Sequence, residues 1–380
     1  MTEKKAAPFG SWKSPITSDL IVAGTISLGD IAVDGLDIYW IESRPAEKGR
    51  SVIVRQAPDG KREDAIPRDF NARTTVHEYG GGSYIVDRGT VYFSNFADQR
   101  IYRQTAGSAE PHPVTLSERT YYADGVIDRG RNRIITVRED HTAPGRDAIN
   151  TIASVNLEGD TSGAVLVSGN DFYSSPRLSP DGKRLAWLTW NHPNMPWDGC
   201  ELWVSDVDGD GLPARPQKVA GGENESVFQP QWSPAGELHF VSDRTGWWNL
   251  YRLRGNRVEP LCEMEAEFGA PQWAFRMSTY AFESESRIIC CYCQQGNWRL
   301  ASLDTSTRKL EPIETPYSDI TNLRVSPGRV LFCGGSPSEP QSIVQLDLAT
   351  GKTEVLRRSS NVEVAPDYRS VPRALEFPTG

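Results

Sequence analysis

The sequence predicts an all-β protein, a β-propeller of about seven four-stranded blades. Short runs in which apolar and polar residues alternate recur along almost the whole chain, as in residues 37–41 (Asp-Ile-Tyr-Trp-Ile), and helical periodicity is scarce. These runs repeat with a period of roughly 40 to 50 residues, which is typical of propeller blades. The 33 glycines and 26 prolines supply turns between short strands.

Two copies of the repeat are clear, and each contains four strand-like segments, called A to D below. The segments of the first copy begin at Pro176, Arg184, Glu201 and Gln217. Those of the second copy begin at Pro230, Glu237, Asn249 and Val258. Weaker copies begin near Ile26, Tyr79, Tyr121, Trp273 and Asp319. Seven blades fit best, and a different division of the weak copies would give six or eight.

We expect one propeller domain over residues 26–358, with an N-terminal extension at 1–25 and an exit segment at 359–380. A chain of 380 residues is long for one ordinary core. A closed array of repeats can nevertheless form a single domain, because each repeat contacts only its neighbours. The exit segment is extended and resembles a linker, which predicts a domain boundary at this end.

The charge and hydropathy of the chain exclude several classes of partner. The formal net charge is −9 and no long basic run occurs, which argues against nucleic acid or an anionic membrane as a partner. No apolar stretch approaches a membrane span, and the first residues lack the pattern of a secretory signal. We therefore expect a cytoplasmic protein.

The six cysteines are expected to be reduced in that compartment. Cys290, Cys291 and Cys293 lie close together, but no matching Cys or His pair follows at a spacing that would complete a metal site. The sequence predicts that they are small core residues of a strand. It predicts no metal and no cofactor.

Strand direction alternates within a blade, so the A-to-B and C-to-D turns share one face of the ring. The turns assigned to this face are generic sequences rich in Gly, Asp and Asn, at residues 157–160, 179–182, 254–256 and 349–351. Residues 206–211 (Asp-Val-Asp-Gly-Asp-Gly) fit the first half of a calcium-binding loop. Gln217 stands where that loop would need a glutamate, so we interpret the segment as a hairpin turn, with calcium left open.

The opposite face receives the B-to-C and D-to-A loops, which are longer and carry aromatic, charged and amide side chains. These loops include residues 77–82, 138–141, 190–199 and 242–249. Binding groups concentrate on loops that a rigid scaffold holds in place. We therefore expect this face to be the working surface. The alternative is that these loops only join the blades.

Four stretches resemble the prolyl oligopeptidase (S9) family of serine peptidases, in particular its acylaminoacyl-peptidase and dipeptidyl-aminopeptidase-like branch. They are residues 8–15, 77–82, 192–199 and 242–251. The resemblance covers essentially the whole chain but only the N-terminal half of the family. Residues 376–380 (Glu-Phe-Pro-Thr-Gly) resemble the crossing into the family's C-terminal α/β-hydrolase domain.

That missing half is where the family's catalytic residues lie. No Gly-x-Ser-x-Gly motif occurs in this chain, and Ser83 in Gly-Gly-Ser-Tyr-Ile lacks the closing glycine. We therefore expect no catalytic residue here and no hydrolysis by this chain alone. The resemblance implies that the parent protein is a serine-type exopeptidase or oligopeptidase.

The resemblance also implies a role in which the propeller restricts access to short peptides and helps to hold them. Glu78, Glu139 and Asp140 would then attract a peptide amine, because a carboxylate in a water-poor cavity attracts an ammonium group strongly. Tyr79 and Trp197 would pack against an apolar side chain, and His192 completes the candidate set. Salt bridges and hydrogen bonds between blades are the alternative role for these residues.

Two other classes of function stay open. A stand-alone binding propeller similar to the periplasmic TolB protein would act without an enzyme, but it needs export. A propeller enzyme, such as a lactonase or a glycosidase, needs acidic or amide side chains on several innermost strands. The innermost segments assigned at 83–86 and 125–128 are mostly apolar, which argues against that class. The sequence leaves self-association open.

Overall fold

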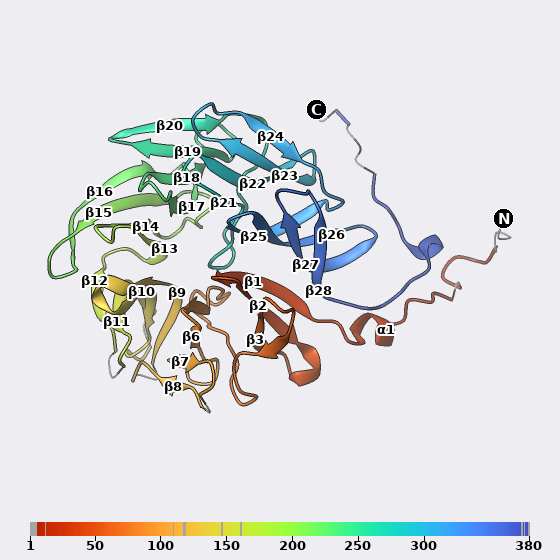
Figure 1. Cartoon of the computed structure of the whole chain (residues 1–380), viewed down its shortest axis with the longest axis horizontal. Helices are drawn as coiled ribbons and strands as arrows, with labels where there is room; N and C mark the ends of the chain where they lie inside the picture. Colours follow the sequence, from red (N-terminus) through yellow and green to blue (C-terminus); the bar gives the residue numbers. More distant parts are fainter. Residues whose placement is uncertain are drawn as a thin grey trace.

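The computed structural model describes residues 6–11, 13–108, 110–116, 119–145, 147–159, 162–373, 375 and 377–378. Within these residues, seven four-stranded antiparallel sheets surround a common centre (Figure 1). Each sheet consists of four consecutive strands, so the predicted seven-bladed propeller is confirmed. Residues 1–5 and 12 of the expected N-terminal extension, and residues 374, 376, 379 and 380 of the expected exit segment, lie outside the described part.

The blades follow one another along the chain. Blades one to three contain β1 Ser27–Asp34, β2 Asp37–Arg44, β3 Arg50–Gln56, β4 Arg62–Asp64; β5 Tyr84–Asp87, β6 Thr90–Ser94, β7 Ile101–Thr105, β8 His112–Pro113; β9 Thr120–Asp128, β10 Arg133–Asp140, β11 Ile149–Asn156, β12 Ala164–Val167. Blades four and five contain β13 Phe172–Leu178, β14 Arg184–Trp190, β15 Glu201–Val207, β16 Pro213–Gly221; β17 Val227–Trp232, β18 Leu238–Ser242, β19 Asn249–Arg254, β20 Arg257–Cys262. Blades six and seven contain β21 Tyr280–Phe282, β22 Arg287–Gln294, β23 Asn297–Asp304, β24 Leu310–Ile313; β25 Asp319–Ser326, β26 Arg329–Ser336, β27 Glu339–Asp347, β28 Thr353–Arg358. The short helices are α1 Ser18–Val22, η1 Pro45–Glu47, η2 Arg129–Arg131 and η3 Pro366–Tyr368.

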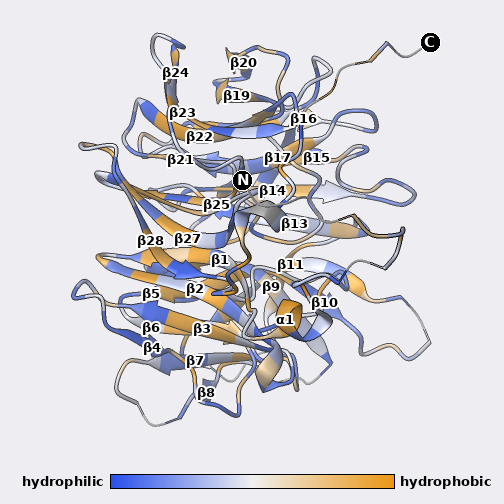
Figure 2. Cartoon of the chain, turned by 90° about the vertical axis from the view of Figure 1, so that its right-hand side faces the viewer, coloured by the Kyte–Doolittle hydropathy of each residue, from blue (hydrophilic) through white to orange (hydrophobic). Residues whose placement is uncertain are grey.

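The core lies between neighbouring blades, because each sheet packs against another sheet on both faces. Central strands are therefore apolar on both sides, and β14 is buried along nearly its whole length. In the colouring by hydropathy, apolar residues gather in the strands and hydrophilic residues in the turns (Figure 2). Cys290 and Cys291 in β22 are fully buried, Cys293 is half-buried, and all three are free thiols. The prediction that they are core residues of a strand is confirmed for the first two.

No described sheet combines strands of the first and the last blade, so side-chain contacts and individual hydrogen bonds join these two blades. Trp40 of β2 lies in one apolar cluster with Leu331 and Ile343 of the seventh blade. The buried Glu42 accepts a hydrogen bond from Nε of Arg357 at 2.7 Å. The backbone N–H of Ile26 donates to the carbonyl of Ser359 at 2.9 Å.

The innermost strands differ from their prediction, because they carry charged and amide groups at a repeated bulge. Asp30, Asp124, Ser175, Gln229 and Asn322 each have a left-handed φ of 45° to 54°. In every one of the five strands the pairing register shifts at or next to this residue, as a β-bulge requires. The expectation that the innermost strands are mostly apolar is therefore wrong.

One of these bulge residues forms a buried ion pair in the central channel. Asp124 is fully buried and accepts a hydrogen bond from Nη1 of Arg177 at 2.9 Å. It also accepts the backbone N–H of Ser175 at 2.8 Å. Both carboxylate oxygens of Asp124 are thus occupied, so the group joins the third blade to the fourth.

Two of the predicted blade starts fall in loops. The second blade begins at Tyr84, after Tyr79, and the sixth begins at Tyr280, after Trp273. Both aromatic side chains are more than half exposed, at 65% for Tyr79 and 52% for Trp273. The aromatic residues that suggest strands in the sequence belong to the loops before β5 and β21.

The predicted turns at 179–182, 254–256 and 349–351 connect consecutive strands, whereas residue 160 of the predicted turn at 157–160 lies outside the described part. Residues 208–212 join β15 to β16 as a hairpin turn, and Asp206 and Val207 are the end of β15. Oδ1 of Asp208 accepts the backbone N–H groups of Asp210 at 3.0 Å and Leu212 at 2.8 Å. This carboxylate therefore organises the turn through local hydrogen bonds.

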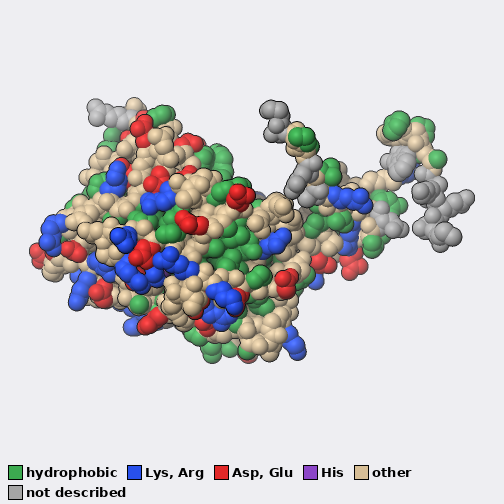
Figure 3. All heavy atoms as spheres, turned by 90° about the horizontal axis from the view of Figure 1, so that it is seen from above, with side chains coloured by type: hydrophobic (Ala, Val, Ile, Leu, Met, Phe, Trp, Pro, Cys, Tyr) green, Lys and Arg blue, Asp and Glu red, His purple; other side chains and the backbone are tan. Residues whose placement is uncertain are grey.

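Both chain ends leave the ring beside each other, next to β1 and β28 (Figure 1). The space-filling view from above shows these segments standing away from the body of the ring (Figure 3). They expose large apolar side chains, namely Phe9, Ile21, Val22, Tyr368, Val371, Leu375 and Phe377. None of the described helices is long and apolar enough to cross a membrane.

The buried imidazole of His239 in β18 gives a prediction for the dependence of stability on pH. Burial lowers the pKa of His239 to about 4, from an ordinary value of 6.5. Between these two values the unfolded chain binds a proton that the folded chain does not, so the stability falls as the pH falls from 6.5 to 4.

His239→Gln should therefore reduce the slope of unfolding free energy against pH in this window by about 1.4 kcal/mol per pH unit. Urea denaturation at a series of pH values measures this slope. His112→Gln, at an exposed position of β8, is the matched control and should leave it unchanged. Equal slopes for the native chain and His239→Gln would contradict the prediction.

Candidate functional site

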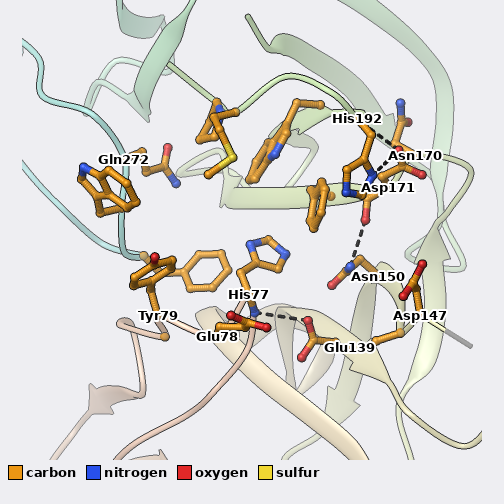
Figure 4. A pocket seen from close by; sticks show the side chains of 18 of the residues that line it. His77, Glu78, Tyr79, Glu139, Asp147, Asn150, Asn170, Asp171, His192 and Gln272 are labelled. Carbon is orange, nitrogen blue, oxygen red and sulfur yellow. Dashed lines mark hydrogen bonds and ion pairs between the residues drawn. The ribbon is translucent and has the colours of Figure 1, made fainter. Parts of the chain in front are cut away.

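A cavity of about 910 Å³ opens on the face that carries the long loops. Its walls come from the loops before β5, β13 and β21, from the loop between β14 and β15, and from residues at the ends of β9, β10 and β11. The cavity is therefore built by the D-to-A and B-to-C connections of several blades. Figure 4 shows the side chains that line it.

Five of the six predicted site residues line this cavity. They are Glu78, Tyr79, Glu139, His192 and Trp197. Asp140 does not line it, and its carboxylate accepts hydrogen bonds from Arg138 at 2.7 Å and from the backbone of Thr142 at 2.8 Å. Residues 242–249 also lie outside the cavity wall. There Arg244 pairs with Glu225 at 2.7 Å.

Carboxylates gather on one side of the cavity (Figure 4). Oε1 of Glu139 accepts the backbone N–H of His77 at 3.2 Å, and Oε2 lies 2.9 Å from Nε2 of His141. Asp171 accepts the backbone N–H of His192 at 2.9 Å and lies 3.1 Å from its Nδ1. The hydrogen bonds from the backbone and side chain of His192 hold the pKa of Asp171 below its ordinary value.

Aromatic rings form the rest of the wall. The ring of His77 packs against Phe172 at 5.2 Å, Trp190 at 5.5 Å and Phe275 at 4.9 Å between centroids. Burial lowers the pKa of His77 to about 4, so its imidazole is neutral at pH 7. On the far side of the cavity, Trp273 packs against Tyr79 at 5.4 Å and Trp197 at 4.4 Å.

The cavity has a closed floor, because two loops meet across the central channel. Gly81 forms a parallel bridge with Phe275, whose backbone N–H donates to the carbonyl of Gly80 at 2.9 Å. A Cβ atom on Gly81 would lie only 2.7 Å from the carbonyl oxygen of Phe275. The run of three glycines in residues 80–82 therefore lets the two backbones touch.

A second hollow, of about 1050 Å³, lies on the other side of this floor. It is lined by the inner strands and by Arg276 and Arg324. Arg276 reaches the second blade, where its Nη1 donates to the carbonyl of Tyr84 at 3.1 Å. The floor thus separates the cavity from the open part of the central channel.

The sequence does not indicate several residues of the cavity wall. Asn150, Asp171 and Gln272 line it, yet they stand in segments that resemble ordinary strand ends and loops. The sequence does single out Trp273, but its aromatic side chain predicts the start of a strand at this position. His77 belongs to a loop of the predicted working surface, although its role at the centre of the cavity depends on the packing of four blades.

The fold and the cavity define the class of this chain as a seven-bladed propeller with an acidic, aromatic cavity on its loop-rich face. No family model and no curated protein matches the chain. Among solved structures, it is similar to a puromycin-hydrolysing peptidase of Mycobacterium tuberculosis, with 35% identity and a TM-score of 0.91. The match covers 97% of this chain and 59% of that protein.

A puromycin hydrolase gives a comparable match, with 32% identity, a TM-score of 0.88, and coverage of 95% of this chain and 58% of that one. A prolyl endopeptidase shares the fold at 13% identity and a TM-score of 0.66, over 88% of this chain and 50% of its own. The chain is homologous to the propeller portion of peptidases of the prolyl oligopeptidase family, as the sequence predicts. It spans less than two thirds of the length of these relatives.

Proposed function

We propose that this chain is the propeller half of a cytoplasmic serine peptidase, and that it gates access and selects short peptides for a C-terminal α/β-hydrolase domain. The observation that carries the proposal is the cavity itself, which lies on the face that would meet the hydrolase domain. Glu78, Glu139 and His192 supply its polar contacts with the peptide. Tyr79 and Trp197 supply its apolar contacts.

Two further observations support a partner domain. The relatives with 32% and 35% identity extend well beyond the region that this chain matches. The described parts of the chain ends expose several large apolar side chains, such as Ile21 and Phe377, and exposed apolar groups favour contact with another surface.

The mass of the native protein isolated from its source cells tests the proposal. We expect a chain longer than this one, whose mass is 42.2 kDa. The excess should be about 30 kDa, which corresponds to a hydrolase domain of roughly 250 residues. A native mass of 42.2 kDa would overturn the proposal and favour a stand-alone binding propeller. A fluorophosphonate should label one serine of the longer protein and none in this chain.

Trp197→Ala should weaken the hydrolysis of short peptides by the full-length protein. The indole is part of the aromatic wall, and the loss of a large apolar contact should lower kcat/KM by about tenfold or more. Trp247→Ala is the matched control, because Trp247 is 40% exposed on the same face but does not line the cavity. Equal effects of the two substitutions would contradict a binding role for the cavity.

A further inference from the structure

The second hollow, which lies on the other side of the floor, is positively charged although the chain as a whole is negative. Within the described residues, its wall holds five basic side chains and three carboxylates, which leave a formal charge of +2. They belong to Arg129, Arg131, Lys183, Arg276 and Arg324, and to Asp87, Asp128 and Asp181. The whole chain carries −9. A concave surface with an excess of one sign concentrates its field on the space inside, so this hollow attracts anions.

The basic residues at the rim of the hollow each have a carboxylate nearby. The pairs are Arg129 with Asp87, Arg131 with Asp128, and Lys183 with Asp181 in the same turn. The hydrogen bond from Ser179, together with the backbone N–H and the charge of Lys183, lowers the pKa of Asp181. These three pairs are balanced in charge, so the excess of the wall belongs to its two remaining arginines.

Arg276 and Arg324, deeper in the hollow, donate hydrogen bonds to neutral backbone carbonyls. Nη1 of Arg276 donates to Tyr84 at 3.1 Å. Nη2 of Arg324 donates to the carbonyl of Arg276 at 3.2 Å, and its Nη1 donates to that of Leu323 at 2.8 Å. Among the described residues, Arg276 has no carboxylate within 4 Å, and Arg324 reaches only Asp30, at 3.9 Å. A carbonyl satisfies an N–H donor but does not neutralise a charge.

Asp30 compensates these two arginines incompletely. It carries at most one negative charge, and it does not line the hollow. Burial raises the pKa of Asp30, which disfavours its ionised form. Burial and the neighbouring charge of Arg276 lower the pKa of Arg324 to about 10, so both guanidinium groups stay charged at pH 7 and repel each other. An anion bound to both would relieve this repulsion.

We infer that this hollow binds a small organic molecule through a phosphate group that carries two negative charges. Planar guanidinium groups match the oxygen geometry of a phosphate, and two of them balance its charge. The volume of about 1050 Å³ lies at the upper end of pockets that enclose small organic ligands. Apolar side chains of the inner strands, such as Val33, Ile85 and Val126, line the same hollow and would contact the organic part. The inference does not depend on the proposed function, because the hollow lies on the opposite side of the floor from the cavity.

Calorimetric binding of phenyl phosphate and of phenol to this chain tests the inference. The two probes share the aromatic ring and differ in the phosphate. At pH 8 the phosphate carries two negative charges, since its second pKa is about 6. We expect phenyl phosphate to bind at least about tenfold more tightly than phenol, as charge-assisted hydrogen bonds imply. Equal affinity, or no binding of phenyl phosphate at millimolar concentration, would overturn the inference.

Two variants locate the site. Arg276→Gln and Arg324→Gln should each weaken the binding of phenyl phosphate by about tenfold and change that of phenol little. Glutamine suits the backbone of Arg276, because Gln229 has a left-handed φ of 48°, close to the 62° of Arg276. Arg257→Gln is the matched control, since Arg257 is exposed at the start of β20 and does not line the hollow. The control should change neither affinity, and undiminished binding of phenyl phosphate by both site variants would overturn the assignment.

Lys183→Gln keeps the test independent of folding. Lys183 is exposed in the turn between β13 and β14, so its loss leaves the core unchanged. It removes a third positive charge from the wall and should weaken the binding of phenyl phosphate by about threefold. If the arginine variants do not fold, an unchanged affinity of Lys183→Gln overturns the assignment.

Discussion

Gly81→Ala is expected to destabilise the chain by about 2 to 5 kcal/mol, since it adds a left-handed strain of about 1 to 2 kcal/mol to an overpacking strain of about 1 to 3 kcal/mol. Gly81 has a φ of 88°, and its new Cβ would lie 2.7 Å from the carbonyl oxygen and 2.8 Å from the nitrogen of Phe275. Backbone atoms of a paired loop cannot move aside as a flexible side chain can. The loops at the cavity floor should therefore separate.

Gly60→Ala is the matched control for this substitution. Gly60 has a φ of 82° in the turn between β3 and β4, and a Cβ atom added there would have no other atom within 4 Å. It should show only the left-handed strain of about 1 to 2 kcal/mol. Urea denaturation of both variants gives the difference. Equal destabilisation of the two would mean that the contact across the channel contributes nothing.

The closed floor of the cavity is a part of the fold that the sequence does not predict. The repeat, the turn residues and the alternation of strands are local signals, so they predict seven blades and the two faces of the ring. The floor instead joins segments of the second and sixth blades, and Arg276 and Tyr84 in this region are separated by 192 positions. No local sequence pattern distinguishes three glycines that close a channel from three glycines that form an exposed turn.

The residues of the candidate site could be predicted only in part from the sequence. Glu139 and Asp140 are both predicted, but neighbouring residues of a strand point to opposite faces, so β10 directs only Glu139 into the cavity. The alternation rule could have separated them once the strand was placed. Asn150 and Gln272 become part of the cavity wall only through the packing of the ring.

Charges on the innermost strands escape prediction for a related reason. The regular alternation of a strand predicts which face each side chain points to, but it does not predict a bulge. The direction of Asp124 and of the equivalent residues in other blades therefore cannot be predicted from alternation alone. The left-handed residue in each of five strands changes the direction of the following side chains, and it allows Asp124 to meet Arg177 of the next blade. The bulge repeats around the ring although its residue changes from Asp to Ser, Gln and Asn.

Glu42→Gln is expected to lower the free energy of unfolding by about 2 to 4 kcal/mol, because it breaks the ion pairs of a buried carboxylate, one of which joins the first blade to the last. The side chain of Glu42 is 2% exposed and lies 2.7 Å from Arg357 and 2.9 Å from Arg44. It also accepts the indole N–H of Trp40 at 3.2 Å. Neutralising this carboxylate removes a charged partner from Arg357 and from Arg44 and leaves a buried side chain that satisfies their donors less well.

Glu339→Gln tests whether burial of the carboxylate causes the effect expected for Glu42→Gln. Glu339 pairs with Arg358 at 2.6 Å in the same blade, but both side chains are about half exposed, at 52% and 44%. A solvent-exposed pair of this kind contributes about 0 to 1 kcal/mol. Urea denaturation should therefore separate the two variants clearly, and a coupling between Glu42→Gln and Arg357→Gln in a double-mutant cycle should assign the difference to this contact. A small effect of Glu42→Gln would mean that the apolar cluster around Trp40 and the hydrogen bond between Ile26 and Ser359 hold the first and last blades together without this carboxylate.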